Sequence, residues 1–164
     1  ENFEKGLILD AHIAQNEEQR LIMWERREAA AEISLLKTPL INNDIAVPLD
    51  QVSKFLTVME KKLPELDPDA DVLIVSHLGD GNVHYTVWPS KDDEKHKDKI
   101  MEAIETVVLT LGGSFSAEHG IGLSKLSSME RRKDRVSLDV MRQIKNAIDP
   151  EDIMNPGKVL PKVQ

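Results

Sequence analysis

The sequence predicts a single α+β domain over residues 1–164, in which an antiparallel sheet is covered by helices in a ferredoxin-like arrangement. Two observations indicate this class. First, stretches with apolar residues at helical spacing alternate with short β-branched stretches. Second, two β-branched runs at 71–78 and 83–88 flank an Asp80-Gly81 pair, which is one of the strongest short-range signals for a β-hairpin.

The other elements follow from periodicity and from residues that break helices. A helix is predicted over residues 1–37, because apolar residues recur three and four positions apart until a proline at position 39. Adjacent glycines at 112 and 113 end a later helix. The remaining elements are predicted as an extended segment at 40–47, helices at 49–63 and 92–111, a strand at 114–116, a loop at 117–122 and two short helices, the second at 138–148.

Composition restricts the function. A formal net charge of −8 argues against nucleic acid as a partner, because phosphate binding needs a basic surface. The chain has no cysteine, so any metal must be held by His, Asp, Glu or backbone oxygen. Neither a signal peptide nor an apolar run near the ~20 residues of a membrane span is visible, and we expect a cytoplasmic location, at most peripheral to a membrane. The chain begins at Glu1, which indicates a fragment of a longer protein.

The predicted hairpin contains two histidines. If Asp80-Gly81 is a two-residue turn, His77 lies directly opposite His84. Opposite residues of an antiparallel pair project from the same face with Cβ atoms ~4.5–5.5 Å apart. The two imidazoles could therefore bind one divalent cation. The alternative is an ordinary hairpin with two polar cross-strand residues.

A second polar pair follows the short strand at 114–116. Glu118 and His119 lie in a glycine-rich loop at the end of this strand, where functional residues are often found. Glu118 could supply a third, anionic metal ligand and leave a coordination position open. His119 is then a candidate general base beside the metal. An exposed Glu-His pair on a turn is the alternative.

Other charged features are weaker candidates. Arg27 could bind a substrate carboxylate through two parallel N–H bonds, although a solvated helix face with pairs to neighbouring Glu explains it equally well. We expect His12 to be a packing or surface residue and His96 to lie on a solvated helix start. The short basic run 130–133 lacks interleaved aromatic residues and is not typical of a nucleic-acid site.

Three motifs in order carry a family resemblance. They are His77-Leu-Gly-Asp-Gly-Asn-Val-His84, Gly113-Ser-Phe-Ser-Ala-Glu-His-Gly-Ile-Gly122 and Asp149-Pro-Glu-Asp-Ile-Met-Asn-Pro-Gly-Lys158. Together they resemble the carboxy-terminal domain of the FAD-linked oxidases, which include D-lactate dehydrogenases, the glycolate oxidase flavin subunit and D-2-hydroxyglutarate dehydrogenase. Trp24-x-x-Arg27 and Asp44-Ile-Ala-Val-Pro48 look like upstream markers of the same family.

The resemblance implies a cap domain that works with an FAD-binding domain expected upstream. It implies that a divalent metal, zinc or a similar ion, is held by His77, His84 and Glu118, and that His119 acts as a base near the substrate. It further implies that Arg27 contacts the carboxylate of a small 2-hydroxy acid. Asn155 and Lys158, in the terminal Asn-Pro-Gly-Lys motif, would approach the flavin.

Departures from the family pattern concern the substrate. Where members acting on hydroxyglutarate carry Thr and Lys contacts, this chain has Ala31 and Asn42, and where they carry Asn it has Thr86. These differences favour a monocarboxylate such as lactate or glycolate, with Thr86 in the substrate site. We also expect the isolated chain to be inactive, because no glycine-rich nucleotide loop is visible in it.

Two other functions stay open at this point. One is a stand-alone metal-binding or assembly module without redox activity. The other is a metal-dependent hydrolase that uses the same histidines and glutamate on water, although no nucleophile elbow or His-Glu-x-x-His helix supports it. The sequence also leaves a homodimer open.

Overall fold

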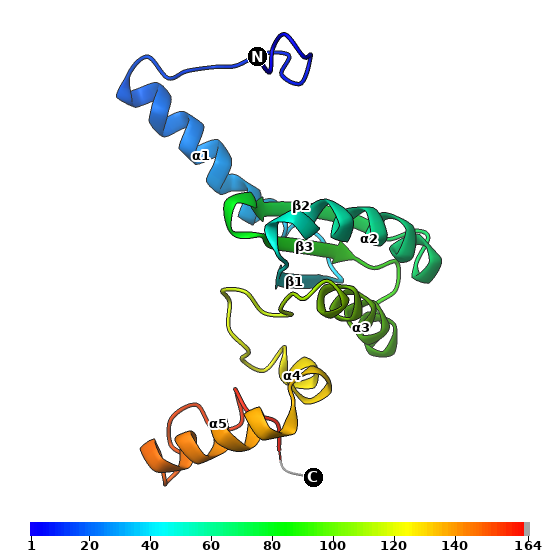
Figure 1. Ribbon diagram of the computed structural model, residues 1–164, viewed down its shortest axis with the longest axis vertical. Coiled ribbons are helices and arrows are strands. Elements are labelled where there is room, and N and C mark those ends of the chain that lie inside the picture. The colour runs from blue at the N-terminus through cyan, green and yellow to red at the C-terminus, as the bar shows by residue number, and fades with distance from the viewer. Residues whose placement is uncertain (163–164) are drawn as a thin grey trace. The chain divides into compact units, whose positions relative to one another are not determined.

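The computed structural model describes residues 1–162, except for the side chains of residues 30 and 31. Figure 1 shows the elements along the chain. Residues 1–37 and 38–164 form two compact units, so the organisation of the chain as one domain stays a prediction.

Helix α1, Glu17–Ile33, lies in the first unit and begins later than predicted. The Asn16 side chain caps it by accepting a hydrogen bond from the backbone N–H of Gln19 at 2.9 Å. The Gln19 side chain in turn accepts one from the backbone N–H of Gln15 at 2.8 Å. Residues before the cap form turns and bends, so the first part of the helix predicted at 1–37 is wrong. The run Asn16-Glu-Glu-Gln19 is the sequence signal for the true start.

The second unit is built on a three-stranded antiparallel sheet. Its strands are β1 (Ile41–Ala46), β2 (Asp71–His77) and β3 (Asn82–Trp88), in the spatial order β1-β3-β2. The strand predicted at 114–116 is reduced to one antiparallel bridge between Ala46 and Ser114 on the outer edge of β1. That bridge occupies the place of the fourth strand in a ferredoxin-like sheet.

Helices α2 (Val52–Leu66) and α3 (Glu94–Thr110) cover one face of the sheet (Figure 1). Every second residue of β1 and β3 points into this layer, where the core forms. Its fully buried side chains from the helices are Phe55, Met59, Ile100, Ile104 and Val108, and those from the strands include Ile45, Val83 and Val87. Burial of each such side chain stabilises the fold by about 1.5–3 kcal/mol. The core therefore fixes which strand residues face away from the helices.

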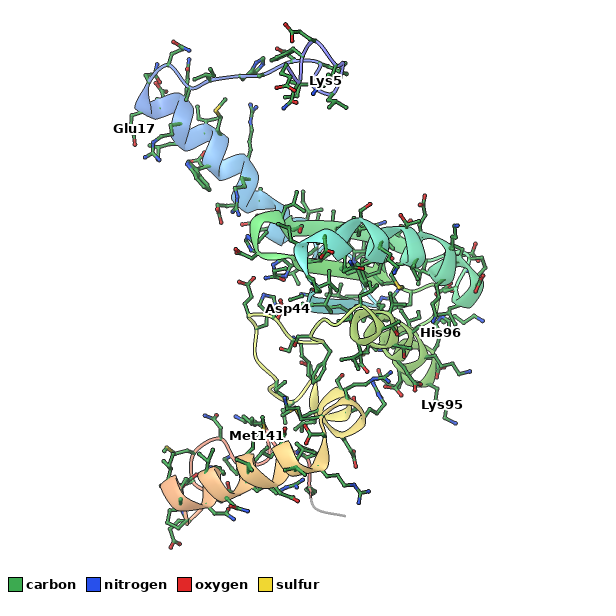
Figure 2. All side chains as sticks on the ribbon, in the orientation of Figure 1. Lys5, Glu17, Asp44, Lys95, His96 and Met141 are labelled. Carbon is green, nitrogen blue, oxygen red and sulfur yellow. The ribbon has the colours of Figure 1, made fainter. Side chains whose placement is uncertain are left out.

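One predicted surface residue is part of this structure. His96 of α3, labelled in Figure 2, donates a hydrogen bond from Nε2 to the buried carboxylate of Asp67 at 2.8 Å, and only 17% of its side chain is exposed. Asp67 ends α2 and also accepts a hydrogen bond from the backbone N–H of Ser90. The segment around His96 is a largely exposed helix start, as predicted, but the His96 side chain itself is mostly buried and joins the end of α2 to the start of α3.

Two further helices follow the loop after α3. Helix α4, Leu126–Arg132, docks on α3 through the buried carboxylate of Glu105, which accepts hydrogen bonds from Ser128 and from Arg132 Nε. Helix α5 runs from Arg135 to Ile148 and is capped by the Asp134 side chain. The short elements η1 (Leu49–Gln51) and η2 (Leu78–Asp80) complete the structure.

Within residues 1–162 no helix is long and apolar enough to cross a membrane. The α+β prediction is confirmed.

Candidate metal centre

The sheet face opposite α2 and α3 carries the polar residues of the candidate site. In the register of β1 with β3, Asp44 lies directly opposite His84. In the register of β2 with β3, His77 pairs with Asn82, two residues before His84 on the same face. Strand alternation thus directs these side chains away from the apolar core and toward the loop that follows α3.

The predicted hairpin register is wrong, although the two histidines do meet. The turn is not two residues long: η2 and Gly81 connect the strands, and His84 pairs with Val75 instead of His77. The shift amounts to two residues, and because side chains alternate with a period of two, the face is preserved. The rings of His77 and His84 lie 5.3 Å apart, nearly perpendicular to one another.

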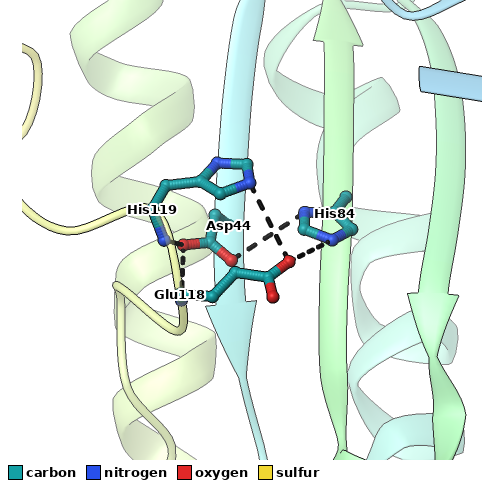
Figure 3. Close-up of side chains that lie close together, drawn as sticks. All are labelled: Asp44, His84, Glu118 and His119. Atoms are coloured by element: carbon teal, nitrogen blue, oxygen red, sulfur yellow. Dashed lines mark hydrogen bonds and ion pairs between the residues drawn. The ribbon is translucent and has the colours of Figure 1, made fainter.

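The loop after α3 brings Glu118 and His119 to His84 (Figure 3), and Glu118 also lies close to His77. Glu118 Oε1 lies 3.0 Å from His84 Nε2, 3.5 Å from His77 Nε2 and 3.9 Å from His119 Nε2. The His119 ring stacks on the His84 ring at 5.1 Å. Three imidazole nitrogens therefore converge on one carboxylate oxygen. The side chains of Glu118 and His119 are about half exposed, which leaves one side of the cluster open to solvent.

The donor set fits a divalent cation. Ligands held ~2.0–2.1 Å from a tetrahedral ion lie ~3.4 Å apart, close to the 3.0 and 3.5 Å between Glu118 Oε1 and the Nε2 atoms of His84 and His77. A second grouping of Asp44, His84, Glu118 and His119 also has one ligand atom of each within 4.8 Å of the others. However, His84 faces Asp44 with Nδ1 and Glu118 with Nε2, and one ion cannot reach both ring nitrogens. The Nε2 side carries more donors.

Two residues of the site escaped the sequence analysis as functional groups. Asp44, labelled in Figure 2, is fully buried, and its Oδ2 accepts hydrogen bonds from the loop that carries Glu118. Lys125 is also buried, with Nζ 3.2 Å from Asp44 Oδ2 and 2.9 Å from Ser116 Oγ. Asp44 appeared in the sequence only as the first residue of the family marker Asp44-Ile-Ala-Val-Pro48, with no role assigned to it, and the sequence offers no comparable signal for Lys125.

The charge of Asp44 is stabilised by its surroundings. Burial acts to raise the pKa of this carboxyl, but the backbone N–H groups of His119 and Glu118 and the ammonium of Lys125 outweigh burial and lower the pKa below its ordinary value. Asp44 is therefore an anion at neutral pH, beside His84.

Arg27 lies on α1 in the first unit, and its placement relative to the centre stays a prediction. Within that unit its guanidinium pairs with Glu28 at 2.7 Å and lies 5.3 Å from the centre of the Trp24 ring. About half of the side chain is exposed, so it is accessible to a ligand carboxylate. The side chain of Ala31, the other helix residue compared with the family, lies outside the described residues.

The remaining predicted residues occupy two places. Thr86 follows His84 on the same face of β3, lies opposite Asn42 and is buried. Asn155 and Lys158 are exposed on a turn of the C-terminal tail, where the Lys158 N–H donates to the Asn155 carbonyl at 3.3 Å. Buried Asp149 holds the start of this tail by accepting hydrogen bonds from the N–H groups of Ile153 and Met154. The structure thus places Thr86 beside His84 on one sheet face and leaves Asn155 and Lys158 exposed on the tail.

Fold and site together define a two-layer α+β domain with a histidine–carboxylate centre on the sheet face opposite its helices. Sequence comparison identifies which such domain this is. The family FAD linked oxidases, C-terminal domain, matches residues 1–159, and the chain belongs to that family.

Curated relatives have related activities in their names. The chain is 34% identical over 163 residues to D-2-hydroxyglutarate dehydrogenase of Stutzerimonas stutzeri, covering 95% of this chain and 34% of the relative. It is 31% identical over 165 residues to glycolate oxidase subunit GlcD of Bacillus subtilis, covering 97% and 34%. It is 29% identical over 161 residues to the mitochondrial D-lactate dehydrogenase [cytochrome] of Arabidopsis thaliana, covering 93% and 28%. The chain therefore spans about a third of the length of these relatives.

Proposed function

We propose that this chain is the substrate- and metal-binding portion of an FAD-dependent dehydrogenase or oxidase of small 2-hydroxy acids. The observation that carries the proposal is the convergence of the Nε2 atoms of His77, His84 and His119 on Glu118 Oε1. Family membership supports a flavin as the redox cofactor. The names of the relatives support a 2-hydroxy acid as the substrate.

The residues of the chain would divide the work as follows. His77, His84 and Glu118 would hold a divalent ion, zinc or a similar metal, which supplies a Lewis acid that lowers the pKa of a hydroxyl group. His119, at the open side of the cluster, would accept the hydroxyl proton on its imidazole. Arg27 would hold the substrate carboxylate by paired N–H bonds and so orient the carbon that is oxidised.

The flavin would be bound mainly by a partner domain. Asn155 and Lys158 are exposed on the C-terminal tail and could contact it without rearrangement of the described core. FAD supplies the acceptor for the hydride that leaves the substrate carbon. We therefore expect the isolated chain to be inactive in 2-hydroxy acid oxidation.

The sheet favours a substrate with a single carboxylate. Asn42 and Thr86 lie opposite one another on the face that carries the metal centre. None of the three strands contains a lysine or an arginine, so the sheet offers no cation for a second carboxylate. A buried or half-buried carboxylate without a cationic partner is costly. Lactate or glycolate suits these residues better than hydroxyglutarate.

Metal content and activity test the proposal. We expect the chain to bind stoichiometric zinc or a similar divalent ion, and His84→Ala to lower metal content and activity together. Metal would be measured by mass spectrometry of the purified chain, and activity by dye reduction with 2-hydroxy acids after reconstitution with an FAD-binding domain. His12→Ala removes an exposed imidazole of the first unit and serves as the control. Full metal occupancy in His84→Ala would refute the site, whereas metal binding without any dye reduction would favour a metal-binding module without redox activity.

A further inference from the structure

Asp44 lies next to both His84 and the loop that carries Glu118, but it is not one of the groups that converge around His84 Nε2. It lies on β1 directly opposite His84 on β3, and it is fully buried. Its two carboxylate oxygens have different surroundings: Oδ2 faces the loop that carries Glu118, whereas Oδ1 faces the His84 ring (Figure 3). The two oxygens therefore impose two separate constraints.

Oδ2 fixes the loop. It accepts hydrogen bonds from three consecutive backbone N–H groups, those of Ala117 at 3.2 Å, Glu118 at 2.9 Å and His119 at 2.8 Å. Lys125 Nζ adds a fourth donor at 3.2 Å. Successive N–H groups around one anion form a concave backbone nest, and hydrogen bonds to a charged acceptor are stronger than neutral ones. The backbone that presents Glu118 and His119 is thus held mainly by Asp44 Oδ2, and the Asp44 carbonyl oxygen also accepts a hydrogen bond from the Ala117 N–H at 3.1 Å.

Oδ1 has no hydrogen-bond partner although it is buried. A buried oxygen without a hydrogen-bond partner destabilises the fold, so a donor close to Asp44 Oδ1 is expected to pair with it. His84 Nδ1 lies 3.8 Å away, beyond hydrogen-bonding distance but within reach of a small rotation of the ring. The other nitrogen of the same ring, Nε2, faces Glu118. An ion bound on the Nε2 side is therefore separated from Asp44 by the imidazole itself.

We propose that Asp44 is a positioning residue that couples the two main ligands of the centre. Resting on the proposed metal function, the inference is that Oδ1 accepts a hydrogen bond from His84 Nδ1–H while Oδ2 anchors the Glu118 loop. A proton fixed on Nδ1 leaves the lone pair of Nε2 for the metal, as carboxylate partners of metal-binding histidines generally do. Asp44 thus sets the tautomer of one ligand and the position of the other, and it is not itself a ligand.

Asp44→Asn tests the hydrogen-bonding roles of Asp44 without changing how the side chain packs, because the amide has nearly the same shape as the carboxylate. If the Asn carbonyl oxygen takes the place of Oδ2, the amide N–H₂ faces His84 Nδ1 and favours a proton on Nε2 instead. If the amide is flipped, its N–H₂ meets three N–H donors of the loop. Either orientation disturbs one ligand. We expect zinc affinity to fall about 10- to 100-fold, the range typical for loss of such outer partners.

The experiment uses the 164-residue chain with zinc as the probe. Zinc affinity would be measured by competition with a chelator for wild type, Asp44→Asn and the control Asp67→Asn, at a temperature where circular dichroism shows each folded. Asp67 is matched to Asp44, since it is also buried and also partners a histidine, but it lies at the end of α2. Nitrogen NMR of the zinc-loaded wild type would show which nitrogen of His84 binds the metal.

The outcomes are distinct. Weaker zinc binding by Asp44→Asn alone, with Nε2 coordinated and Nδ1 protonated in wild type, supports the inference. Unchanged affinity in a folded Asp44→Asn chain, or coordination of His84 through Nδ1, overturns it while the metal centre stands. If Asp44→Asn does not fold, the wild-type spectrum decides. A wild-type chain that binds no divalent metal overturns the metal part of the proposed function and this inference with it.

Discussion

The Asp67–His96 pair gives a stability prediction whose size follows from the structure. Asp67 accepts hydrogen bonds from Ser90 and interacts with His96 Nε2 at 2.8 Å. Burial acts to raise the pKa of the Asp67 carboxyl, but the hydrogen bonds from His96 and Ser90 outweigh it and lower the pKa from 3.8 to about 2. Because each pKa unit corresponds to about 1.4 kcal/mol, the ionised carboxylate contributes about 2 kcal/mol to the free energy of unfolding at neutral pH.

The sign of the pH dependence follows from the lowered pKa. A carboxyl that is more acidic in the folded state stabilises the fold above its unfolded pKa and loses that contribution as the pH falls toward the folded value. At pH 3 about 1 kcal/mol of the contribution should remain. Asp67→Asn should therefore be less stable than wild type by about 2 kcal/mol at pH 7, with the difference shrinking as the pH falls.

Urea unfolding of both chains at several pH values, followed by circular dichroism, would measure this difference. Asp69→Asn is a suitable control for the loss of a carboxylate, because Asp69 is exposed in the turn that follows α2. A difference between wild type and Asp67→Asn that stays constant from pH 7 to pH 3 would show that the charge of Asp67 does not act as argued.

Three further predictions concern the ligand, the hairpin and the cofactor. Arg27→Ala should raise the KM for the 2-hydroxy acid with metal content retained, because we propose that Arg27 holds the substrate carboxylate. Steady-state kinetics of the reconstituted enzyme and metal analysis test this, and an unchanged KM would contradict it. Gly81→Ala should lower the free energy of unfolding, measured by urea denaturation, by more than about 1 kcal/mol, because Gly81 has a φ of 69° and an added Cβ would lie 2.1 Å from the Val47 carbonyl oxygen. The control is Gly79→Ala, because an added Cβ there meets open space. The isolated chain should purify without flavin absorbance, and a stoichiometric flavin spectrum would show that it binds FAD by itself.

The sequence was sufficient for the elements whose signals are local. The β-branched runs around Asp80-Gly81 predicted β2 and β3, and apolar periodicity predicted α2 and α3 to within a few residues. The helix at the start of the chain was placed too early, since scattered apolar residues before Asn16 imitate helical spacing without being buried. The strand at 114–116 shrank to one bridge because the Ser116 N–H donates to Ser114 Oγ, so the Asp44 carbonyl oxygen of β1 accepts the N–H of Ala117, one residue further along, instead.

The hairpin of β2 and β3 keeps the two histidines together even though its register was predicted wrongly. Pairing His77 with His84 misjudged the turn by two residues, and a shift of two keeps every side chain on its face. A shift of one residue would have sent His84 into the layer of Phe55 and Val83 and dispersed the cluster. The alternation of apolar and polar residues along β3 therefore constrains the centre more strongly than the geometry of the turn does. Asp44 is different: its position opposite His84 depends on the pairing of β1 with β3, a contact between segments far apart in the sequence, and no local pattern predicts it.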